Sequence, residues 1–565
     1  MHPLTSIYSD LRASRQFIWE RKSRILLIFF FFTLLIGLTA FIPELAPIVF
    51  AAALILPQRL LFRLAADFSE ADYERFSPII ANIADYRFLI ISLTLLSLPA
   101  YYGLFDVNSA WFDIGSMQFI VVACSIGVLV WSESLYEKNY HFGQWHIVER
   151  GLLAVLGPLS LVKPAFMPAF LLVYEVIINQ FQYPGIGSFN VTHSRLPHTI
   201  LIITSAFAFV APIMDVQSHH LLFLLFCGYA AHYFHPGLAK LRNGPLYYIC
   251  HNNPMALFLN AYQIGWLSSI DEEIVYKIGK FSERIKSILN LCVVIIEMGT
   301  ILILFSFPLA FVLITLTILL HLLIFASTGD SFWKWILVDV SIIAALITTS
   351  DQPPVVFMEL QWFVLSIPFV VFASAWMNPA SMDWLDVPYV ELFRFEGDLR
   401  DGKRNVPIHS NVFRPYDSIT TQGITGTLTF LGENPRITYS HGAITEEENK
   451  PLHDRLRDSI LSDPIDDEEA TYLVEKCGVE RYDEEKTKRM EMFIDRFVRS
   501  KREKNSRLFR YFTSPREFYS AGLSDRESSR IVPELETVRI YRVDGIWTNE
   551  GFQELSCKEV VSVDV

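Results

Sequence analysis

The sequence predicts an all-α polytopic membrane helix bundle followed by a smaller C-terminal soluble α+β domain. Of its 565 residues, 52% are hydrophobic and 19% are charged, whereas soluble domains carry about 25% charged residues. Apolar runs long enough to cross a bilayer, roughly 20 residues each, recur between residues 25 and 376. From residue 377 the chain is rich in charge and has no such run. We therefore divide it into a basic N-terminal segment (1–24), a transmembrane helical domain (25–376) and a soluble domain (377–565).

The N-terminus predicts the orientation of the first helix. An apolar run begins at Ile25, and it is too long for the core of a signal peptide and has no small-residue cleavage site. The basic residues before it favour a cytoplasmic N-terminus. We expect an integral protein of a bacterial inner membrane. The basic residues are Arg12, Arg15, Arg21, Lys22 and Arg24.

The apolar runs predict about 8 to 11 transmembrane helices. Pro57 interrupts one run, and Lys163, Pro164 and Pro168 interrupt another. Between the spans, residues 243–285 are amphipathic and aromatic, which is typical of a helix at the membrane interface. The candidate spans are 25–43, 45–64, 88–105, 112–132, 150–177, 198–215, 219–236, 286–306, 308–326, 332–348 and 355–376.

The C-terminal domain shows both strand and helix patterns. "YVELFRFEG", which begins at Tyr389, alternates as a strand does, and "DLRDGK" predicts a turn before a second strand. "GITGTLTFLG" and "TVRIYRVDGIW" also predict strands. Residues 448–512 predict helices. The acidic run "DPIDDEEATYL" resembles a metal–diphosphate motif, but its charged surroundings favour a solvated segment.

Charge and cysteine content exclude several classes of function. The net charge of −13 comes mostly from loops and the C-terminal domain, and we expect no nucleic-acid partner. The six cysteines form no CxxC pair, so neither a zinc site nor a disulfide framework is indicated. His141 and His146 are five residues apart rather than four, which does not favour metal ligation. We therefore expect no metal.

Ionisable residues inside the apolar runs are the candidates for chemistry. Each costs at least roughly 2.5 kcal/mol at the centre of a membrane helix, so a passive bundle has little reason to hold many. Lys240 follows the apolar run 219–236, and a lysine in an apolar pocket can act as a base. It could instead snorkel to the headgroups, and Glu297 could simply bond to a neighbouring helix. The candidate catalytic residues are Lys240, His141, His146, His232, His235, His321 and Glu297; Asp339 is a further ionisable residue in a span.

Three segments resemble a known membrane family. They are "GLAKL" with Lys240, "KNYH" with His141, and "LHLLIFASTGDSFWKW" with His321, Gly329 and Phe332. Together they resemble the horizontally transferred transmembrane domain, the membrane core of vitamin K-dependent γ-carboxylases and many bacterial homologues, over roughly residues 90 to 350. In that family a membrane lysine deprotonates vitamin K hydroquinone. The resemblance implies that Lys240 is the base and that His141 assists it.

The resemblance also shapes the expected substrate. Ala239 stands where the carboxylases have the first of their two adjacent lysines, and the C-terminal domain differs from the family's propeptide-binding region. We therefore expect an apolar quinone or isoprenoid substrate, with a quinone or hydroquinone as the cofactor and membrane lipids as partners. One alternative is an isoprenoid (terpene) cyclase or lyase on the same scaffold. The other is a non-enzymatic membrane receptor or assembly factor.

Overall fold

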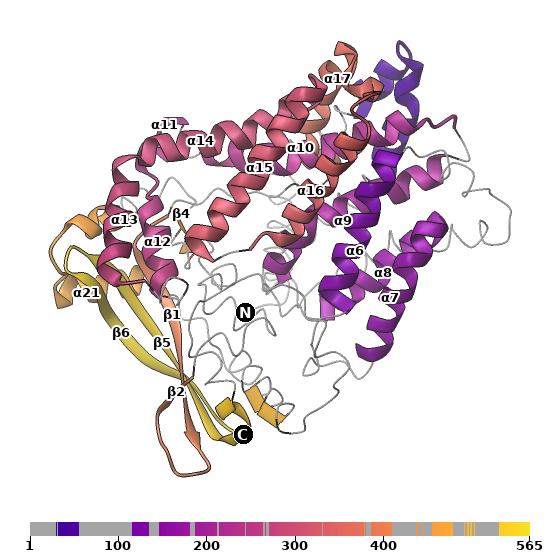
Figure 1. Ribbon diagram of the computed structural model, residues 1–565. Helices are drawn as coiled ribbons and strands as arrows, with labels where there is room; N and C mark the ends of the chain where they lie inside the picture. Colours follow the sequence, from indigo (N-terminus) through magenta and orange to yellow (C-terminus); the bar gives the residue numbers. More distant parts are fainter. Residues whose placement is uncertain are drawn as a thin grey trace, which may run out of the picture.

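The computed structural model describes most of the helical part and much of the C-terminal part. The described chain is mostly helical and carries a small sheet near its C-terminus (Figure 1), as the sequence predicts at this level. Apart from short gaps, the described residues are 30–55, 116–134, 146–180, 187–379, 386–408, 437–444, 455–477, 491–502 and 530–565.

Two described helices are long and apolar enough to cross a membrane. They are α10 (Ser218–Arg242) and α15 (Phe307–Thr328). The apolar stretch of α10 is 94% buried inside the protein, whereas that of α15 is 33% buried. α10 is therefore the central helix, enclosed by α9 (Gly187–Val210), α14 (Lys286–Gly299) and α17 (Leu360–Val371). α15 lies at the periphery and leaves Val312 and Leu319 about half exposed.

Further helices complete this part of the chain. Residues 30–39 and 46–55 are helical and flank the short turn η1 (Pro43–Leu45). α6 packs against α9 and α16, and α17 is preceded by η4 (Val355–Phe357) and followed by α18 (Ala373–Trp376). The remaining helices are α6 (Ser116–Ser134), α7 (His146–Val162), η2 (Pro164–Phe166), α8 (Met167–Gln180), α11 (Pro245–His251), α12 (Pro254–Gln263), α13 (Glu272–Arg284), η3 (Thr300–Leu302) and α16 (Trp333–Thr348).

Two segments that the sequence predicts as continuous are divided into separate helices in the structure. The predicted span 150–177 is two helices, α7 and α8, which pack against each other (Figure 1). The break falls at Pro164, because proline has no N–H to continue the helical bonding. The amphipathic section 243–285 is three short helices, α11, α12 and α13. α13 then meets α14 at an angle of 71°.

The sheet is antiparallel, with strand order β2-β1-β5-β6. Its strands are β1 (Tyr389–Leu399), β2 (Val406–Ile408), β5 (Leu535–Thr548) and β6 (Gly551–Asp564). Two predicted strands are confirmed in β1 and β5, and the predicted turn joins β1 to β2. β6 was not predicted. The predicted strand "GITGTLTFLG" lies outside the described residues; β3 (Ile437–Thr438) and β4 (Ala443–Ile444) form a separate two-stranded pair.

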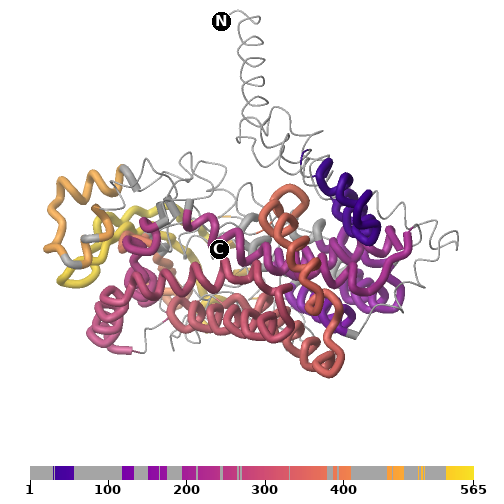
Figure 2. Tube along the Cα trace, turned by 90° about the horizontal axis from the view of Figure 1, so that it is seen from above, coloured from indigo at the N-terminus to yellow at the C-terminus, as the bar shows by residue number. Residues whose placement is uncertain are grey.

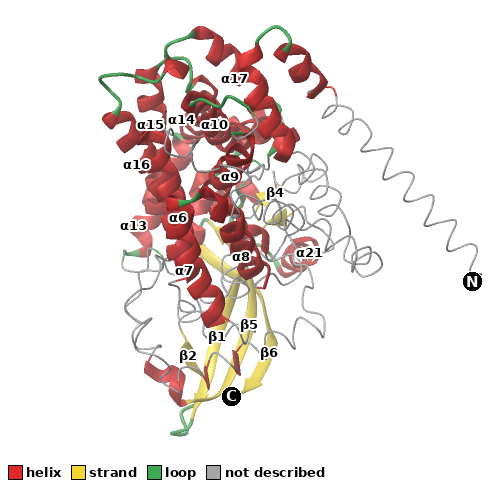
Figure 3. Cartoon of the chain, turned by 90° about the vertical axis from the view of Figure 1, so that its right-hand side faces the viewer, coloured by secondary structure: helices red, strands yellow, loops and turns green. Residues whose placement is uncertain are grey.

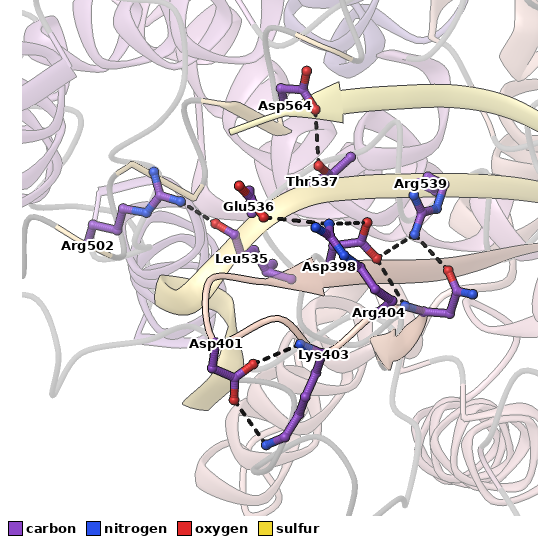
Figure 4. Close-up of polar contacts among 11 residues, drawn as sticks. Asp398, Asp401, Lys403, Arg404, Arg502, Leu535, Glu536, Thr537, Arg539 and Asp564 are labelled. Atoms are coloured by element: carbon purple, nitrogen blue, oxygen red, sulfur yellow. Dashed lines mark hydrogen bonds and ion pairs between the residues drawn. The ribbon is translucent and has the colours of Figure 1, made fainter.

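Charged side chains hold the turn between β1 and β2. Asp398 accepts hydrogen bonds from Arg539 and Arg404 and from the backbone N–H of Asn405 (Figure 4). The Arg539 guanidinium and the Asn405 N–H lower the pKa of Asp398 to about 2. Asn405 has a φ of 52°, a left-handed conformation that asparagine tolerates better than most residues.

Helical segments cover the sheet. Ile494 and Val498 pack on Val538 and Ile540 of β5. The predicted helices in 448–512 are confirmed where the structure describes them: 455–457 with η8 (Asp458–Leu461), α21 (Asp467–Cys477) and the described positions of 491–502. Figure 2 shows the sheet at one end of the helical part and residues 30–55 at the opposite end, and Figure 3 shows the sheet extending beyond one end of the helices.

The tip of the β5–β6 hairpin docks on α12 and α13. Trp547 is fully buried in a cluster with Met255, Leu259 and Val275. The Tyr276 hydroxyl lies 3.2 Å from the carbonyl oxygen of Ile460 and within hydrogen-bonding distance of two carbonyls at the hairpin tip. α12 and α13 thus connect the helices to the sheet.

Candidate functional site

Lys240 and Glu297 form a buried ion pair. The Lys240 Nζ donates to Glu297 Oε1 at 2.7 Å and to Oε2 at 2.8 Å. Each residue is 7% exposed. One turn earlier in α10, Gly237 lies so close to α14 that a Cβ there would come within 2.8 Å of Met298. Lys240 therefore faces inward against α14 rather than outward from the helices.

The ion pair lies where the helices meet the C-terminal domain. Asp386, just before β1, is buried, and its N–H donates to Asn252 Oδ1 at 2.8 Å. Burial raises the pKa of Asp386 to about 7, while the Asn252 hydrogen bond and the Lys240 charge oppose this rise. Asn290 of α14 donates to the carbonyl oxygens of Ile249 and Asn252. We call Lys240, Glu297 and Asp386 the junction centre.

A second polar group lies deeper along α10. The Tyr233 hydroxyl donates to Asp339 Oδ2 at 2.8 Å, and the Thr317 hydroxyl lies 3.3 Å from the same oxygen. His321 Nδ1 lies 3.4 Å from the Tyr233 hydroxyl and 3.9 Å from Asp339 Oδ2. Tyr229 shares a hydrogen bond of 2.8 Å with Thr317. We call Tyr229, Tyr233, Thr317, His321 and Asp339 the core network, which joins α10, α15 and α16.

One oxygen of the core network has no hydrogen-bond partner among the described residues. Asp339 is 0% exposed, and its Oδ1 accepts no hydrogen bond from the described part of the chain. Buried polar atoms are nearly always paired, and an exception calls for an explanation such as a catalytic role or a bound molecule. Asp339 is therefore the most distinctive ionisable residue of the bundle.

Aromatic rings surround the core network. The His321 ring stacks on Phe332 with centroids 4.9 Å apart and an interplanar angle of 11°. Trp335 meets Tyr233, His321 and His232 edge-on, with centroids 5.3 to 5.6 Å apart. The buried Trp335 Nε1 has no acceptor among the described residues. The site thus offers an acid, a hydroxyl, an imidazole and an indole N–H within apolar walls.

The predicted histidines of α10 point to different helices. His232 Nε2 shares a hydrogen bond with Thr199 of α9 at 2.9 Å, whereas His235 Nε2 bonds to the Val370 carbonyl oxygen of α17 at 3.0 Å. Because α10 is surrounded by other helices, side chains three residues apart on it meet different neighbours.

The structure describes some of the other predicted residues and not others. His321 belongs to the core network and Glu297 to the junction centre. His141 lies outside the described residues, and of His146 the structure describes only the backbone, at the start of α7. The roles assigned to both remain predictions.

The acidic run "DPIDDEEATYL" has local partners. Asp466 Oδ1 accepts the Glu469 N–H at 2.8 Å as α21 begins, and Glu469 pairs with Arg455. These contacts support a solvated helix start rather than a diphosphate site. Within the described residues, no three His, Cys, Asp or Glu side chains are placed to share a metal ion.

Comparison with known proteins gives no relative: no protein-family model, curated protein or solved structure matches the chain. The sequence reading missed Tyr233 and Trp335 and did not select Asp339 as a site residue. Asp339 carried the stronger signal, because it is an acid inside the apolar run 332–348. Tyr229 and Tyr233 are four residues apart on α10, which places them on one helix face.

Proposed function

We propose that the chain is a polytopic integral membrane enzyme that carries out acid–base chemistry on an apolar, lipid-soluble substrate of the quinone or isoprenoid class. The observation that carries the proposal is the core network, in which the unpartnered Oδ1 of Asp339 lies inside the helical part. Ionisable residues buried in membrane helices commonly mark functional sites.

Exposed apolar side chains support a membrane location. Besides the exposed positions of α15, α7 leaves Val155 and Val162 more than half exposed, and α17 does so with Leu360 and Val364. Monomeric soluble proteins rarely expose apolar surface on this scale. A bilayer would cover these faces.

The core network supplies the groups for proton transfer. Asp339 Oδ1 is the free position at which a substrate proton is taken or given. The Tyr233 hydroxyl, bonded to Oδ2, stabilises the carboxylate when the proton leaves, and His321 lies next to that hydroxyl. A positioned acid or base of this kind typically contributes 10² to 10⁴ in rate.

The surrounding groups suit a quinone or a prenyl chain. The Trp335 Nε1 can donate to a quinone carbonyl oxygen, and the rings of Phe332 and Trp335 offer apolar contact. A quinone bound there would supply the redox chemistry. The chain's residues would orient it and handle its protons.

An isoprenoid cyclase is the second candidate. An acid enclosed by aromatic rings could protonate a double bond and stabilise the resulting carbocation through cation–π contacts. The core network with Trp335 and Phe332 favours this chemistry as a protonation-initiated reaction. The acidic run before α21, which is used as a helix start, gives no support to ionisation of a diphosphate.

Lys240 as the base remains the prediction that the carboxylase resemblance makes. The geometry favours Asp339 instead, because Lys240 already donates to both Glu297 oxygens.

The test deletes the gene in the source organism and returns it as wild type, Asp339→Asn or Ser341→Ala. Lipid and quinone extracts of the deletion strain and the three complemented strains are then compared. Ser341 lies on the same helix as Asp339 and donates to the Val338 carbonyl of its own helix, so it is the matched control. We expect wild type and Ser341→Ala to restore the lipids that are lost on deletion. These lipids should stay absent in cells that carry Asp339→Asn. Restoration by Asp339→Asn at equal protein level would overturn the proposal.

A further inference from the structure

One helix, α13, has three faces of distinct character. Its buried face packs against α12 and the hairpin tip through Val275, Gly279 and Ser282. A Cβ on Gly279 would come within 2.9 Å of Met255, so the two helices are in close contact. A charged face carries Glu273, Lys277, Lys280 and Arg284. The third face is apolar and exposed.

The apolar face is ordered along the helix. Ile274, Ile278 and Phe281 are 50%, 42% and 61% exposed, and their spacing of four and three residues places them in one stripe. Nothing described in the chain covers them. The stripe lies between the buried face and the charged face, which is the arrangement of a helix that rests on a protein, faces an apolar phase and borders water.

The next helix, α14, also carries an exposed apolar stripe. Its residues Ile288, Leu291 and Ile295 are 64%, 43% and 59% exposed and lie at helical spacing along α14. α14 carries the apolar segment that, together with α13, qualifies as a broken span. α13 is therefore followed directly by a helix with its own exposed apolar face, which the proposed function places in the bilayer.

We propose that α13 lies in the plane of the bilayer surface, with Ile274, Ile278 and Phe281 inserted at the boundary between headgroups and acyl chains. The inference rests on the membrane location in the proposed function. Because the Tyr276 hydroxyl lies within hydrogen-bonding distance of carbonyls near the β5–β6 tip and Trp547 packs beside Val275, α13 also fixes the sheet domain against the membrane. The partner is the lipid surface itself.

The charges of α13 indicate which lipids it needs. Lys277, Lys280 and Arg284 are balanced by Glu272, Glu273 and Glu283. A helix without net charge gains little from anionic headgroups, whose attraction scales with the number of basic residues. Insertion therefore depends on the apolar stripe and proceeds on zwitterionic lipid.

The test places a fluorescent amino acid at one position of the full chain, reconstituted in phosphatidylcholine vesicles that contain lipids brominated at a shallow or a deep carbon. The positions are Ile278 and Phe281, Lys280 as the control on the charged face, and Leu319 of α15 as the control for a spanning helix. Aqueous iodide serves as the quencher of water-exposed positions.

We expect shallow bromines to quench positions 278 and 281 at least twofold more than deep ones. Iodide should quench position 280 alone, deep bromines should quench position 319, and added phosphatidylglycerol should change nothing. Quenching at 319 without quenching at 278 and 281 would overturn the inference and leave the membrane location standing. Absence of lipid quenching at 319 would overturn both.

Two other outcomes would also contradict the inference. Protection of positions 278 and 281 from iodide without any lipid quenching would assign the stripe to a second copy of the chain. Lipid quenching at these positions only when phosphatidylglycerol is present would assign the contact to charge rather than to apolar insertion.

Discussion

The junction centre and the core network lie seven residues apart on α10, about 10 Å along the helix, yet they are built differently. In the first, Lys240 meets Glu297 through both carboxylate oxygens, and the opposite charges are matched. In the second, Asp339 is held by hydroxyl groups, and the described residues leave its Oδ1 without a hydrogen bond. A matched pair stabilises and positions two helices, whereas an acid with an open position can exchange a proton.

The largest effect is expected from breaking the matched pair. Glu297→Leu leaves the Lys240 ammonium buried without its partner, which costs about 3 to 5 kcal/mol of unfolding free energy. The double variant Lys240→Met/Glu297→Leu replaces both charges with apolar groups and should recover most of this loss. Denaturant unfolding of the protein in detergent measures both.

An exposed ion pair supplies the control. Lys277 and Glu273 are paired on α13 with side chains 70% and 74% exposed. Lys277→Met should lower the unfolding free energy far less than Glu297→Leu, because exposed ion pairs contribute little. A Glu297→Leu cost as small as this, or a double variant worse than the single one, would show that the pair contributes little.

The next largest loss of unfolding free energy is expected from removing a hydroxyl group of the core network. Tyr233→Phe removes the hydroxyl that donates to Asp339 and leaves the buried carboxylate oxygen with its longer Thr317 contact, so we expect a loss of about 1 to 3 kcal/mol. Tyr229→Phe, which removes a hydroxyl paired with Thr317, should cost less. The same unfolding measurement ranks the two variants; equal losses would mean that Asp339 is not the hub of the network.

A pH profile tests whether Asp386 belongs to the junction centre. The pKa of Asp386 is about 7 in the folded chain and about 3.9 in an unfolded one. Between these values the folded state holds a proton that the unfolded state has released, so stability falls as pH rises, by at most about 1.4 kcal/mol per pH unit. Asp386→Asn should flatten this slope. A variant with the slope of the wild type would place the titrating group elsewhere.

A helix-capping residue outside both centres sets a baseline. Asp271 accepts the Glu273 N–H as the N-cap of α13, and Asp271→Ala should cost about 1 kcal/mol. Thermal unfolding should shift less than for Tyr233→Phe. A larger shift would mean that α13 contributes more to the docking of the sheet than its contacts indicate.

Much of the fold follows from local pattern. Long apolar runs predicted α10 and α15, and alternation predicted β1 and β5. β6 was not predicted, because it is an edge strand that is exposed on much of both faces. Its sequence "FQELSCKEVV" therefore shows no regular alternation of apolar and polar residues. The hairpin turn before it, with Gly551 at a φ of 120°, was the available signal.

The site was predictable by residue type but not by partner. Lys240, Glu297 and His321 each stood out as ionisable groups in apolar runs. Lys240 and Glu297 are 57 residues apart, and Asp339 and Tyr233 are 106 apart. Such pairings depend on how the helices pack against one another, which no local sequence pattern predicts.

The most direct test incubates purified protein with a membrane lipid extract in heavy water and follows lipid masses and deuterium content by mass spectrometry. If the core network is the reaction centre, wild type and the Lys240→Met/Glu297→Leu variant will convert the same lipid, and Asp339→Asn will leave it unchanged. Conversion by Asp339→Asn together with its loss in the Lys240→Met/Glu297→Leu variant would contradict the account and assign the chemistry to the junction centre.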